Sequence, residues 1–438
     1  MCAQLRLLGA AFGAGLILAL AACGSAANLN PTLETLTSPA VTLTAAREPT
    51  ATPTLEPTPA GPLRLVVWWP DTLAPASRAE AVALLQTQIA AFAAAQPDIV
   101  VELRLKKAAG IGGILETLRA ASAVAPGARP DLLLLQRADL LTAVQANLLE
   151  PLEGRVSSAI LGDLYTAALE LGQVGGQLHG LAYALEVQHV AYAPPPVEGN
   201  FASFETTLAA GRPLVFAAGQ PAGVSEIFLL HYVSAGGSLA DLNLGRVNVD
   251  ALRAVFAFYA EAVERGILPE SVANYTTISD YLQEFKTGAL AAVITSTLYQ
   301  QIAAEDQRWL FAPIPTASGQ PATLLDGWMW ATTAASSDRQ AAAARFLNWM
   351  FEVERQAELT QAAGWLPSQR TARRMQAQPN TDYLNFADGL LLNASPALSE
   401  SLSASTARAL ENALLAVISG QRRADEAVQD VVNQLNGG

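Results

Sequence analysis

The sequence predicts an α/β fold with a largely parallel sheet, because strand-like and helix-like segments alternate through its first third. Residues 63–69 predict a strand, and an alanine-rich helix follows over residues 79–95. Residues 99–105 alternate like a second strand, and residues 113–123 predict a second helix. Residues 131–135 form a continuous apolar run, which is typical of a strand buried on both faces.

The second half of the chain predicts amphipathic helices, which could cover such a sheet. Residues 250–266 place apolar side chains at helical spacing, between a possible cap at Asp250 and a stop at Gly266. Residues 336–354 carry another apolar stripe that includes Trp349, so we expect this tryptophan in the core and not at a ligand site. The C-terminal stretch predicts two more helices, with stripes at Leu410, Leu414 and Val417 and at Val428, Val431 and Leu435.

The first 23 residues predict export and lipidation. Arg6 is their only charge, and the apolar run over residues 7–20 is too short to span a bilayer, which is typical of a signal peptide in residues 1–22. Residues 20–23, Leu-Ala-Ala-Cys, resemble a bacterial lipobox, which implies a diacylglyceryl group on Cys23. The alternative is an ordinary signal peptide with a chance cysteine. The lipobox would hold the protein on the extracytoplasmic face of a bacterial cell membrane by lipid alone.

Residues 23–61 begin at this cysteine and predict a tether, because they are rich in Thr, Pro and Ala and show no hydrophobic period. About 375 residues follow, which is too many for one hydrophobic core and enough for two lobes. Without the signal peptide the chain has 25 basic and 39 acidic residues, a net charge of about −14. This balance argues against nucleic acid as a partner.

Several enzyme signatures do not occur in the sequence. The dipeptide GK is missing, which excludes the common phosphate-binding loop, and AAGIGGILE (108–116) carries Leu115 where a dinucleotide loop needs its third glycine. The chain has no GxSxG motif, and its three histidines show no zinc-binding spacing, so we expect neither a metal nor another cofactor. One enzyme alternative remains, a secreted glycosidase that uses two of the carboxylates Asp71, Glu186 and Asp326.

Residues 180–194, GLAYALEVQHVAYAP, resemble the crossover strand of family 1 extracellular solute-binding proteins. These are the sugar-binding lipoproteins of ABC importers, related to maltodextrin-binding protein. Further segments resemble the family in the same order and cover essentially the whole chain after residue 62: 128–135, 231–241, 247–270, 285–296, 311–367 and 411–435. The sequence departs from the family pattern at Ala182, Ala193, Ala292 and Val293, which bears on the ligand more than on the fold.

The resemblance implies a two-lobed, periplasmic-binding-protein-like fold of type II. Each lobe would be an α/β unit with a mainly parallel sheet flanked by helices. The first lobe would contain residues 62–187 and 326–370, and the second would contain residues 188–325 and 371–438. A hinge with few chain crossings would let the lobes close over a ligand.

In open α/β sheets, ligands bind beyond the carboxyl ends of the strands. Trp68 and Trp69 end the first predicted strand, and neighbouring side chains on a strand point to opposite faces. We therefore expect Trp68 in the core and Trp69 at the cleft wall as a platform for a sugar ring, next to Asp71. One of Trp328 and Trp330 is also expected to line the cleft.

Polar ligand contacts are expected from the loop after the apolar run, where Gln136 and Arg137 follow Leu135. A salt bridge is the alternative interpretation of Arg137. The resemblance places four further residues near the ligand, namely Glu186, Gln188, Ser296 and Trp365.

The resemblance therefore implies a receptor that performs no chemistry. It would act as a monomer, capture a mono- or oligosaccharide between its lobes and deliver the sugar to the permease subunits of an ABC importer. Two alternatives stay open, the glycosidase described above and a receptor of the same fold for a solute other than a sugar. Arg137 would suit an anionic group on such a solute.

Overall fold

The computed structural model describes residues 61–438, except residues 76, 222, 377–380 and 437–438. The predicted signal peptide, the lipidation site Cys23 and the tether up to residue 60 lie outside the described residues. The described elements belong to a compact unit that begins at Pro59. Among them, no helix combines the length and the apolar character that a membrane crossing requires.

Strands and helices alternate along the described chain. The strands are β1 (Leu63–Pro70), β2 (Ile99–Lys106), β3 (Leu132–Leu135), β4 (Gln173–Val174), β5 (Gln177–Leu178), β6 (Leu181–Tyr192), β7 (Leu214–Val215), β8 (Ala291–Thr295), β9 (Leu310–Ala312), β10 (Thr323–Thr332), β11 (Leu366–Pro367) and β12 (Ala394–Ser395). The α-helices are α1 (Ala79–Ala95), α2 (Ile114–Val124), α3 (Arg137–Gln145), α4 (Ser158–Asp163), α5 (Thr166–Gly172), α6 (Phe204–Ala210), α7 (Glu226–Ser234), α8 (Leu239–Asn243), α9 (Val249–Glu264), α10 (Leu282–Lys286), α11 (Ser296–Glu305), α12 (Ser337–Met350), α13 (Val353–Ala363), α14 (Arg370–Met375), α15 (Thr381–Leu391), α16 (Ala404–Ile418) and α17 (Ala424–Asn436). Short 3-10 helices are η1 (Pro126–Ala128), η2 (Glu198–Phe201), η3 (Glu270–Asn274), η4 (Ile278–Asp280) and η5 (Ser399–Ser401).

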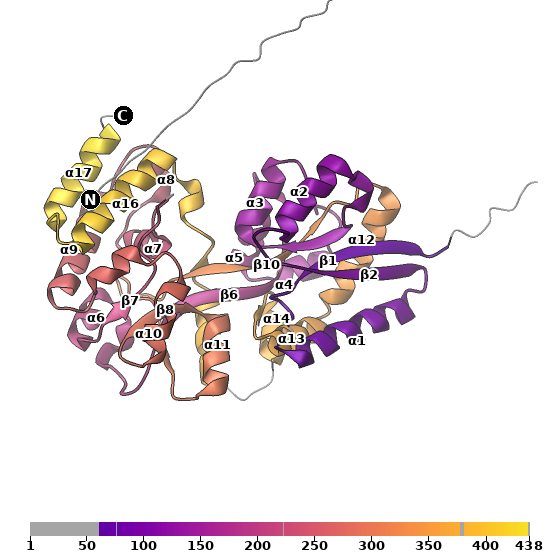
Figure 1. Cartoon of the computed structure of the whole chain (residues 1–438), viewed down its shortest axis with the longest axis horizontal. Helices are drawn as coiled ribbons and strands as arrows, with labels where there is room; N and C mark the ends of the chain where they lie inside the picture. The colour runs from indigo at the N-terminus through magenta and orange to yellow at the C-terminus, as the bar shows by residue number, and fades with distance from the viewer. Residues whose placement is uncertain (1–60, 76, 222, 377–380, 437–438) are drawn as a thin grey trace, which may run out of the picture. The chain divides into compact units, whose positions relative to one another are not determined.

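One hydrogen-bonded path of strands runs through the molecule in the order β2-β1-β3-β10-β6-β8-β7. At one end β1 lies parallel to both β2 and β3, and at the other end β7 lies parallel to β8. The long strands β6 and β10 are antiparallel to each other and stand in the middle of the path (Figure 1). The α/β prediction is therefore confirmed, with an antiparallel centre between two parallel ends.

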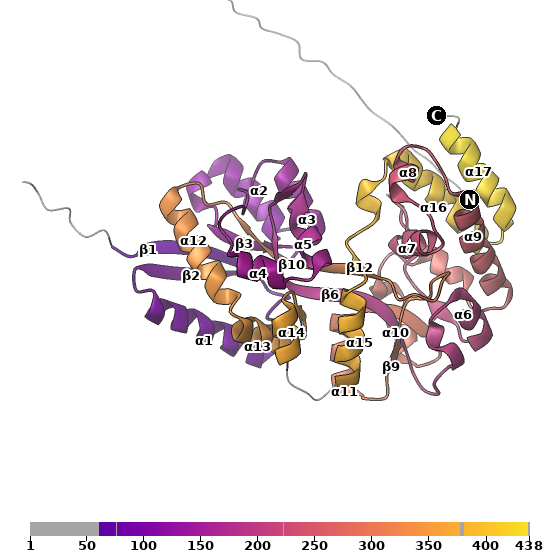
Figure 2. The same ribbon diagram turned by 180° about the vertical axis from the view of Figure 1, so that it is seen from behind.

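Two lobes follow from the way the apolar side chains cluster. Around β1 and β3, one cluster lies on the face covered by α1, α12 and α13, and another lies on the face covered by α2, α3 and α5. A separate cluster surrounds β7 and β8 and takes in α7, α9, α16 and α17. The strands β6 and β10 run from one lobe into the other, and α15 lies against them, on the near side in the reverse view (Figure 2).

Two histidines and one glutamate are buried ionisable groups, and one of them, His189, lies on the crossing strand β6. Burial lowers the pKa of His189 to about 4 and that of His231 to about 3. His231 Nδ1 lies 2.7 Å from the hydroxyl oxygen of Tyr259. The Glu411 carboxylate accepts hydrogen bonds from two backbone N–H groups, those of residues 220 and 225, yet burial raises its pKa to about 7.

Close contact between β6 and β10 depends on a glycine. Gly327 stands opposite Leu185, and a Cβ atom at Gly327 would lie 2.2 Å from the carbonyl oxygen of Ala184. No side chain other than hydrogen fits at this position unless the two strands separate. The register shifts directly afterwards, between Trp328 and Met329.

We expect Gly327→Ala to reduce the free energy of unfolding by about 1–3 kcal/mol, because the added methyl group overpacks the contact between the strands. Urea unfolding followed by circular dichroism would measure the change. Gly389→Ala is the matched control, because a Cβ atom there meets nothing within 4 Å and alanine is favoured over glycine in a helix. A variant Gly327→Ala as stable as wild type would contradict the interpretation.

Candidate functional site

The candidate site begins where β6 and β10 pass between the two lobes. Glu186 on β6 and Asp326 on β10 are register partners, so their side chains lie on the same face of the sheet. Glu186 accepts a hydrogen bond of 2.6 Å from the Thr297 hydroxyl, and Asp326 accepts one of 2.7 Å from the Gly327 N–H. Two carboxylates thus stand side by side in the middle of the molecule.

The protonation of this pair is shifted by its surroundings. Burial raises the pKa of Glu186 to about 6, the hydrogen bond from Thr297 opposes that shift, and the nearby Asp326 carboxylate adds to it. Burial likewise raises the pKa of Asp326, against the effect of its backbone hydrogen bonds. The pair therefore holds protons more firmly than exposed acids do.

A pocket of about 220 Å³ opens over these carboxylates and is lined from both lobes. Its lining residues are Arg137, Ala138, Glu186, Gln188, Glu226, Thr295, Leu324, Leu325, Asp326, Ala397 and Glu400. Four of them are carboxylates and only one is a cation. The polar groups can exchange hydrogen bonds with the hydroxyl groups of a ligand.

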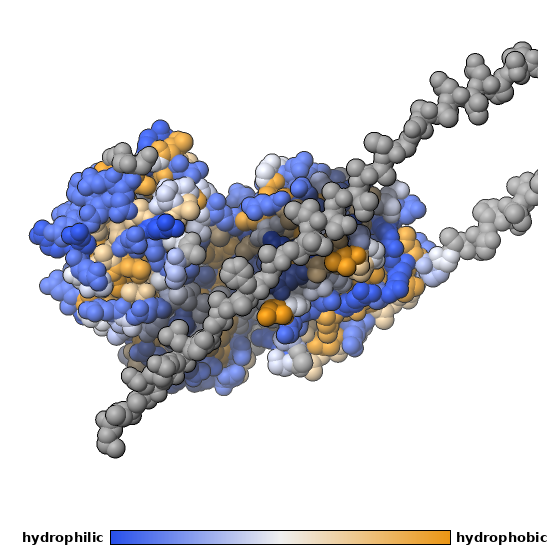
Figure 3. Space-filling view, turned by 45° about the horizontal axis from the view of Figure 1, so that its top comes forward, coloured by the Kyte–Doolittle hydropathy of each residue, from blue (hydrophilic) through white to orange (hydrophobic). Residues whose placement is uncertain are grey.

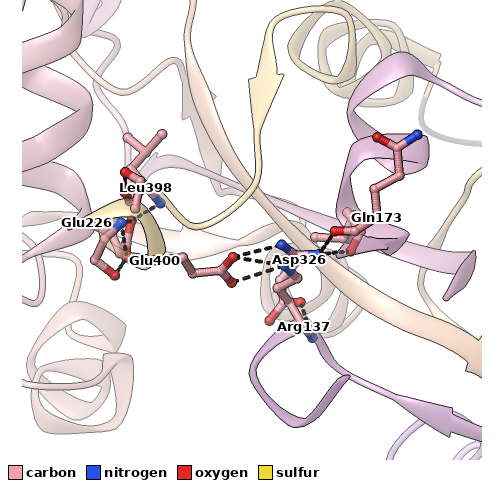
Figure 4. A network of polar contacts seen from close by, with 9 residues as sticks. Arg137, Gln173, Glu226, Asp326, Leu398 and Glu400 are labelled. Atoms are coloured by element: carbon pink, nitrogen blue, oxygen red, sulfur yellow. Dashed lines mark hydrogen bonds and ion pairs between the residues drawn. The ribbon is translucent and has the colours of Figure 1, made fainter. Parts of the chain in front are cut away.

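Arg137 is largely committed to partners within the protein (Figure 4). Its guanidinium Nε donates to both carboxylate oxygens of Glu400, at 3.1 and 3.0 Å, and Nη2 lies 2.9 Å from Oε2 of the same residue. Its Nη1 donates to the carbonyl oxygens of Leu171 and Gln173, each at 2.7 Å. The salt-bridge interpretation of Arg137 is thus confirmed, and little of its hydrogen-bonding capacity is left for an anionic ligand.

Glu226 fixes the chain that carries Glu400. Its carboxylate accepts from the backbone N–H of Leu398 at 2.6 Å and from that of Ser399 at 3.1 Å, and also from the Ser399 hydroxyl. Glu226 is the first residue of α7, and its neighbours Ile227 and Phe228 belong to the core around β7 and β8. This contact therefore ties the segment before α16 to that lobe.

A larger pocket of about 490 Å³ lies beside the first one. It is lined by Thr72, Pro75, Ser77, Arg78, Thr297, Leu298, Gln301, Ala304, Glu305, Ala363 and Trp365. The two pockets adjoin, because Thr297 lines the larger one while its hydroxyl is bonded to Glu186 in the smaller one. Figure 3 shows a recess between the two lobes.

Three predicted site residues, Arg137, Glu186 and Gln188, line the smaller pocket, and Trp365 lines the larger one. The structure brings these four side chains to the junction of the lobes. Whether they contact a ligand stays a prediction.

The expected roles of the two tryptophans on β1 need correction. Trp68 and Trp69 are both buried, with exposed fractions of 1% and 0%. Trp68 packs in the cluster on one face of the sheet and Trp69 in the cluster on the other face. Neighbouring side chains do point to opposite faces, but helices cover both faces, so Trp69 has no free surface for a sugar ring.

Trp328 and Trp330 are also buried, at 2% and 0% exposure, so the expectation that one of them lines the cleft is not met either. The ring of Trp330 lies 5.6 Å from that of Trp69 and 6.1 Å from that of Tyr183, with edge-to-face geometry. These side chains are core residues of the first lobe.

Three other predicted residues lie outside both pocket linings. Asp71 is exposed and accepts a hydrogen bond of 3.1 Å from the N–H of Ala108. Gln136 is half-buried directly before α3. Ser296 is fully buried, and its hydroxyl accepts a hydrogen bond of 3.2 Å from the N–H of Val187.

Three pocket residues were not predicted from the sequence, namely Thr297, Glu226 and Glu400. Thr297 is one residue beyond the predicted Ser296, and the first turn of α11 turns it toward the pockets. Glu226 follows Ser225, whose side chain caps α7, a pattern that predicts a helix start and not a pocket. Glu400 lies far along the chain from Arg137, and no local motif connects the two.

A profile of the bacterial extracellular solute-binding protein family matches residues 87–383. The chain belongs to this family. The match covers well over half of the sequence and includes the crossing strands β6 and β10 and the helix α11. A comparison with curated protein sequences gave no significant match.

Solved structures of solute-binding proteins share the fold. A cyclic α-maltosyl-1,6-maltose binding protein from Arthrobacter globiformis is 19% identical with a TM-score of 0.66, over 86% of this chain and 99% of that one. The maltose-binding protein MalE from Listeria monocytogenes, in complex with maltose, is 14% identical with a TM-score of 0.65, over 85% and 97%. A family 1 extracellular solute-binding protein from Bifidobacterium longum subsp. infantis is 16% identical with a TM-score of 0.63, over 86% and 100%.

At these identities the likeness concerns the fold. The chain has the two-lobed architecture of periplasmic binding proteins, so the predicted fold and family are confirmed. The family is one of extracellular binding proteins, which places the protein outside the cytoplasm.

We expect Arg137→Met to reduce the free energy of unfolding by about 2 kcal/mol, because it leaves two carbonyl groups and Glu400 without their partner. The Arg137 side chain is only 13% exposed, so solvent replaces these bonds poorly. Arg265→Met is the control, since the pair of Arg265 with Glu261 is 51% and 44% exposed and should contribute about 0.5 kcal/mol or less. Equal losses in the two variants, measured by urea unfolding, would contradict this account.

Proposed function

We propose that the protein is the solute receptor of an ABC importer. It captures a carbohydrate, a mono- or oligosaccharide, between its two lobes and delivers it to a membrane permease. Membership of the family and the sugar ligands named for its structural neighbours support this function. The observation that carries it is the pair of adjoining polar pockets lined from both lobes.

The proposed lobes comprise residues 62–187 with 326–370 and residues 188–325 with 371–438. Two observations support this division. The apolar cluster that contains Val190 and the following strands is separate from those that contain Tyr183 and Leu185, although Leu325 and α15 pack with Leu185 at the boundary between the lobes. The polar stretch of β6 falls between these cores, where a hinge can bend without exposing a core.

In the proposed complex the sugar ring packs against Trp365 while its hydroxyl groups bond to polar residues of the smaller pocket. Trp365 is the aromatic side chain among the lining residues of the two pockets, and 8% of it is exposed. Glu186 and Gln188 accept or donate hydrogen bonds at the pocket floor. Asp71, Gln136 and Ser296 are proposed as outer or supporting residues of this site.

We further propose that the receptor binds its ligand without converting it, acts as a monomer and needs no cofactor. A glycosidase would need two carboxyl groups on either side of the scissile bond, about 5 Å or more apart. Of the three candidate carboxylates, Asp71 lines neither pocket, and Glu186 and Asp326 already accept hydrogen bonds from Thr297 and from the Gly327 N–H. Sugars recovered intact after incubation with the protein would agree with a receptor, and hydrolysed sugars would not.

The first experiment is a thermal-shift screen of the full chain against neutral mono- and oligosaccharides. A ligand at a thousand times its Kd stabilises a protein by about 4 kcal/mol, so a bound sugar will raise the melting temperature clearly. For any sugar that does so, we expect Trp365→Ala to weaken binding by about 1–2 kcal/mol, roughly tenfold, in isothermal titration.

Trp349→Ala is the matched control for this loss, because Trp349 is half-buried, lies on α12 and packs under the guanidinium of Arg355 away from both pockets. It should leave the affinity unchanged. If Trp365→Ala stays folded and binds as tightly as wild type, Trp365 is not part of the site. If no sugar binds, the ligand belongs to another class of solute.

Lipid anchoring at Cys23 is the remaining part of the proposal. We expect Cys23→Ser to abolish the incorporation of labelled fatty acid in a bacterial host and to move the protein from the membrane fraction to the soluble fraction. A variant Cys2→Ser is the control and should stay in the membrane fraction. Label that persists in Cys23→Ser would disprove the lipidation site.

A further inference from the structure

The segment of residues 396–403, which we name the strap, connects β12 to α16 and passes beside the smaller pocket. Leu398 and Leu402 of the strap pack against the core of the second lobe. The carboxylate of Glu226 holds the backbone of Leu398 and Ser399 through the hydrogen bonds described above. The strap is therefore a part of the second lobe.

One side chain of the strap reaches the other lobe. Glu400 pairs with Arg137, the first residue of α3, and Leu140 of this helix belongs to a core cluster of the first lobe. Arg137 is in turn fixed to the carbonyl oxygens of Leu171 and Gln173, at the end of α5 and the start of β4 in the first lobe. The ion pair thus joins two elements that belong to different cores.

We propose that Arg137 and Glu400 form an ionic latch across the cleft, and that Glu226 is the positioning residue that seats Glu400 for it. The latch resists separation of the lobes before a solute arrives. This inference rests on the proposed function, because a latch has a purpose only in a receptor whose lobes move.

Three features of the geometry favour a latch over an incidental surface pair. The contact is bidentate, with both oxygens of Glu400 within 3.1 Å of Nε, which fixes orientation as well as distance. Its side chains are 13% and 25% exposed, so water screens them less than the exposed pairs of the molecule. Both partners are also held from behind, Arg137 by carbonyl groups and the strap by Glu226, which lowers the entropy lost when they pair.

The pair also forms part of the wall of the smaller pocket. When the lobes open, the two charges separate, and opening therefore costs the energy of the pair. Salt lowers that cost by screening the charges, since the Debye length falls to about 3 Å at 1 M.

The test measures the distance between the lobes in the ligand-free full chain. Spin labels would be attached at Ala90→Cys on α1 and Ala257→Cys on α9, both exposed positions, in a chain that also carries Cys2→Ser and Cys23→Ser. Pulsed electron resonance reports the distribution of distances. The Arg137–Glu400 ion pair is partly buried, so its strength should lie between that of an exposed pair and that of a buried pair. Losing it should shift the equilibrium between open and closed lobes roughly tenfold, and Glu400→Gln should therefore raise the open population about tenfold.

Glu226→Gln should shift the distances in the same direction, and the double variant Glu226→Gln/Glu400→Gln should open no further than Glu400→Gln alone. That non-additivity separates a positioning role from a general loss of stability. Raising NaCl from 0.05 to 1 M should open the wild type and have little effect on Glu400→Gln. Glu261→Gln, which removes an exposed pair within α9, is the control and should change nothing.

Identical distance distributions in wild type and Glu400→Gln would overturn the latch. A larger open population in the double variant than in Glu400→Gln alone would overturn the positioning role of Glu226. Sugar binding measured on the same samples tests the proposed function separately. Variants that open as expected in a protein that binds no sugar would support the latch and refute the carbohydrate proposal.

Discussion

The antiparallel pairing of β6 and β10 is the constraint on which the rest of the molecule depends. Both strands begin in the core of one lobe and end in or beside that of the other, so their side chains must be apolar at both ends. Where the strands pass between the two cores, polar side chains of β6 and β10 line a pocket. Glu186, Gln188 and Asp326 fall in this interval, and for this reason the polar pocket lies there. The candidate site therefore lies in the interval between the hydrophobic cores of the two lobes.

Local patterns in the sequence were sufficient to predict the strands and helices in much of the first lobe. The strands and helices predicted over residues 63–135 agree with the structure to within one residue at each end, because apolar periodicity and turn residues are local signals. The family resemblance extended the prediction from these elements to the two-lobed fold. It also pointed to Glu186, Gln188 and Trp365, which line the pockets, since motifs in a shared fold carry over position by position. Arg137 was predicted instead from its place in the loop after a buried strand.

Local patterns could not predict which other elements pack on each face of a strand or helix. Trp69 was expected at a cleft because alternation along a strand distinguishes two faces but does not say that helices bury both. The run Val66–Trp69 could have been interpreted like the apolar run of β3, as a strand with no open face. Glu226 and Glu400 can be recognised only from their contacts with partners more than a hundred residues away in the chain. A local sequence pattern does not contain such contacts. Ser296 is buried while the next residue, Thr297, lines the larger pocket, because a helix rotates each successive side chain by about a third of a turn.

Burial of the indoles also shapes the chemistry of the site. Trp69, Trp330 and Tyr183 meet edge to face and stabilise the first lobe directly behind the crossing. The described lining of the two pockets then consists mainly of carboxylates, amides and hydroxyl groups, with Trp365 at the margin. Under the proposed function, such a lining would discriminate by the pattern of hydroxyl groups more than by shape, because an unpaired polar group is costly in a partly buried pocket.

The buried histidines and Glu411 contribute in opposite directions to the way the stability of the fold depends on pH. A protein outside the cytoplasm experiences the acidity of its environment without the buffering of the cell interior. His189 and His231, with pKa values near 4 and 3, stay neutral through the range in which histidines usually respond. Glu411, whose pKa rises from the ordinary 4.5 to about 7, binds its proton more tightly in the folded chain than in the unfolded one. Glu411 therefore adds stability to the folded state as the pH falls from about 7 towards 4.5, and this contribution is lost as the pH rises through that interval. The two histidines act in the opposite direction, because below their ordinary pKa of 6.5 the unfolded chain takes up protons that the folded chain does not bind.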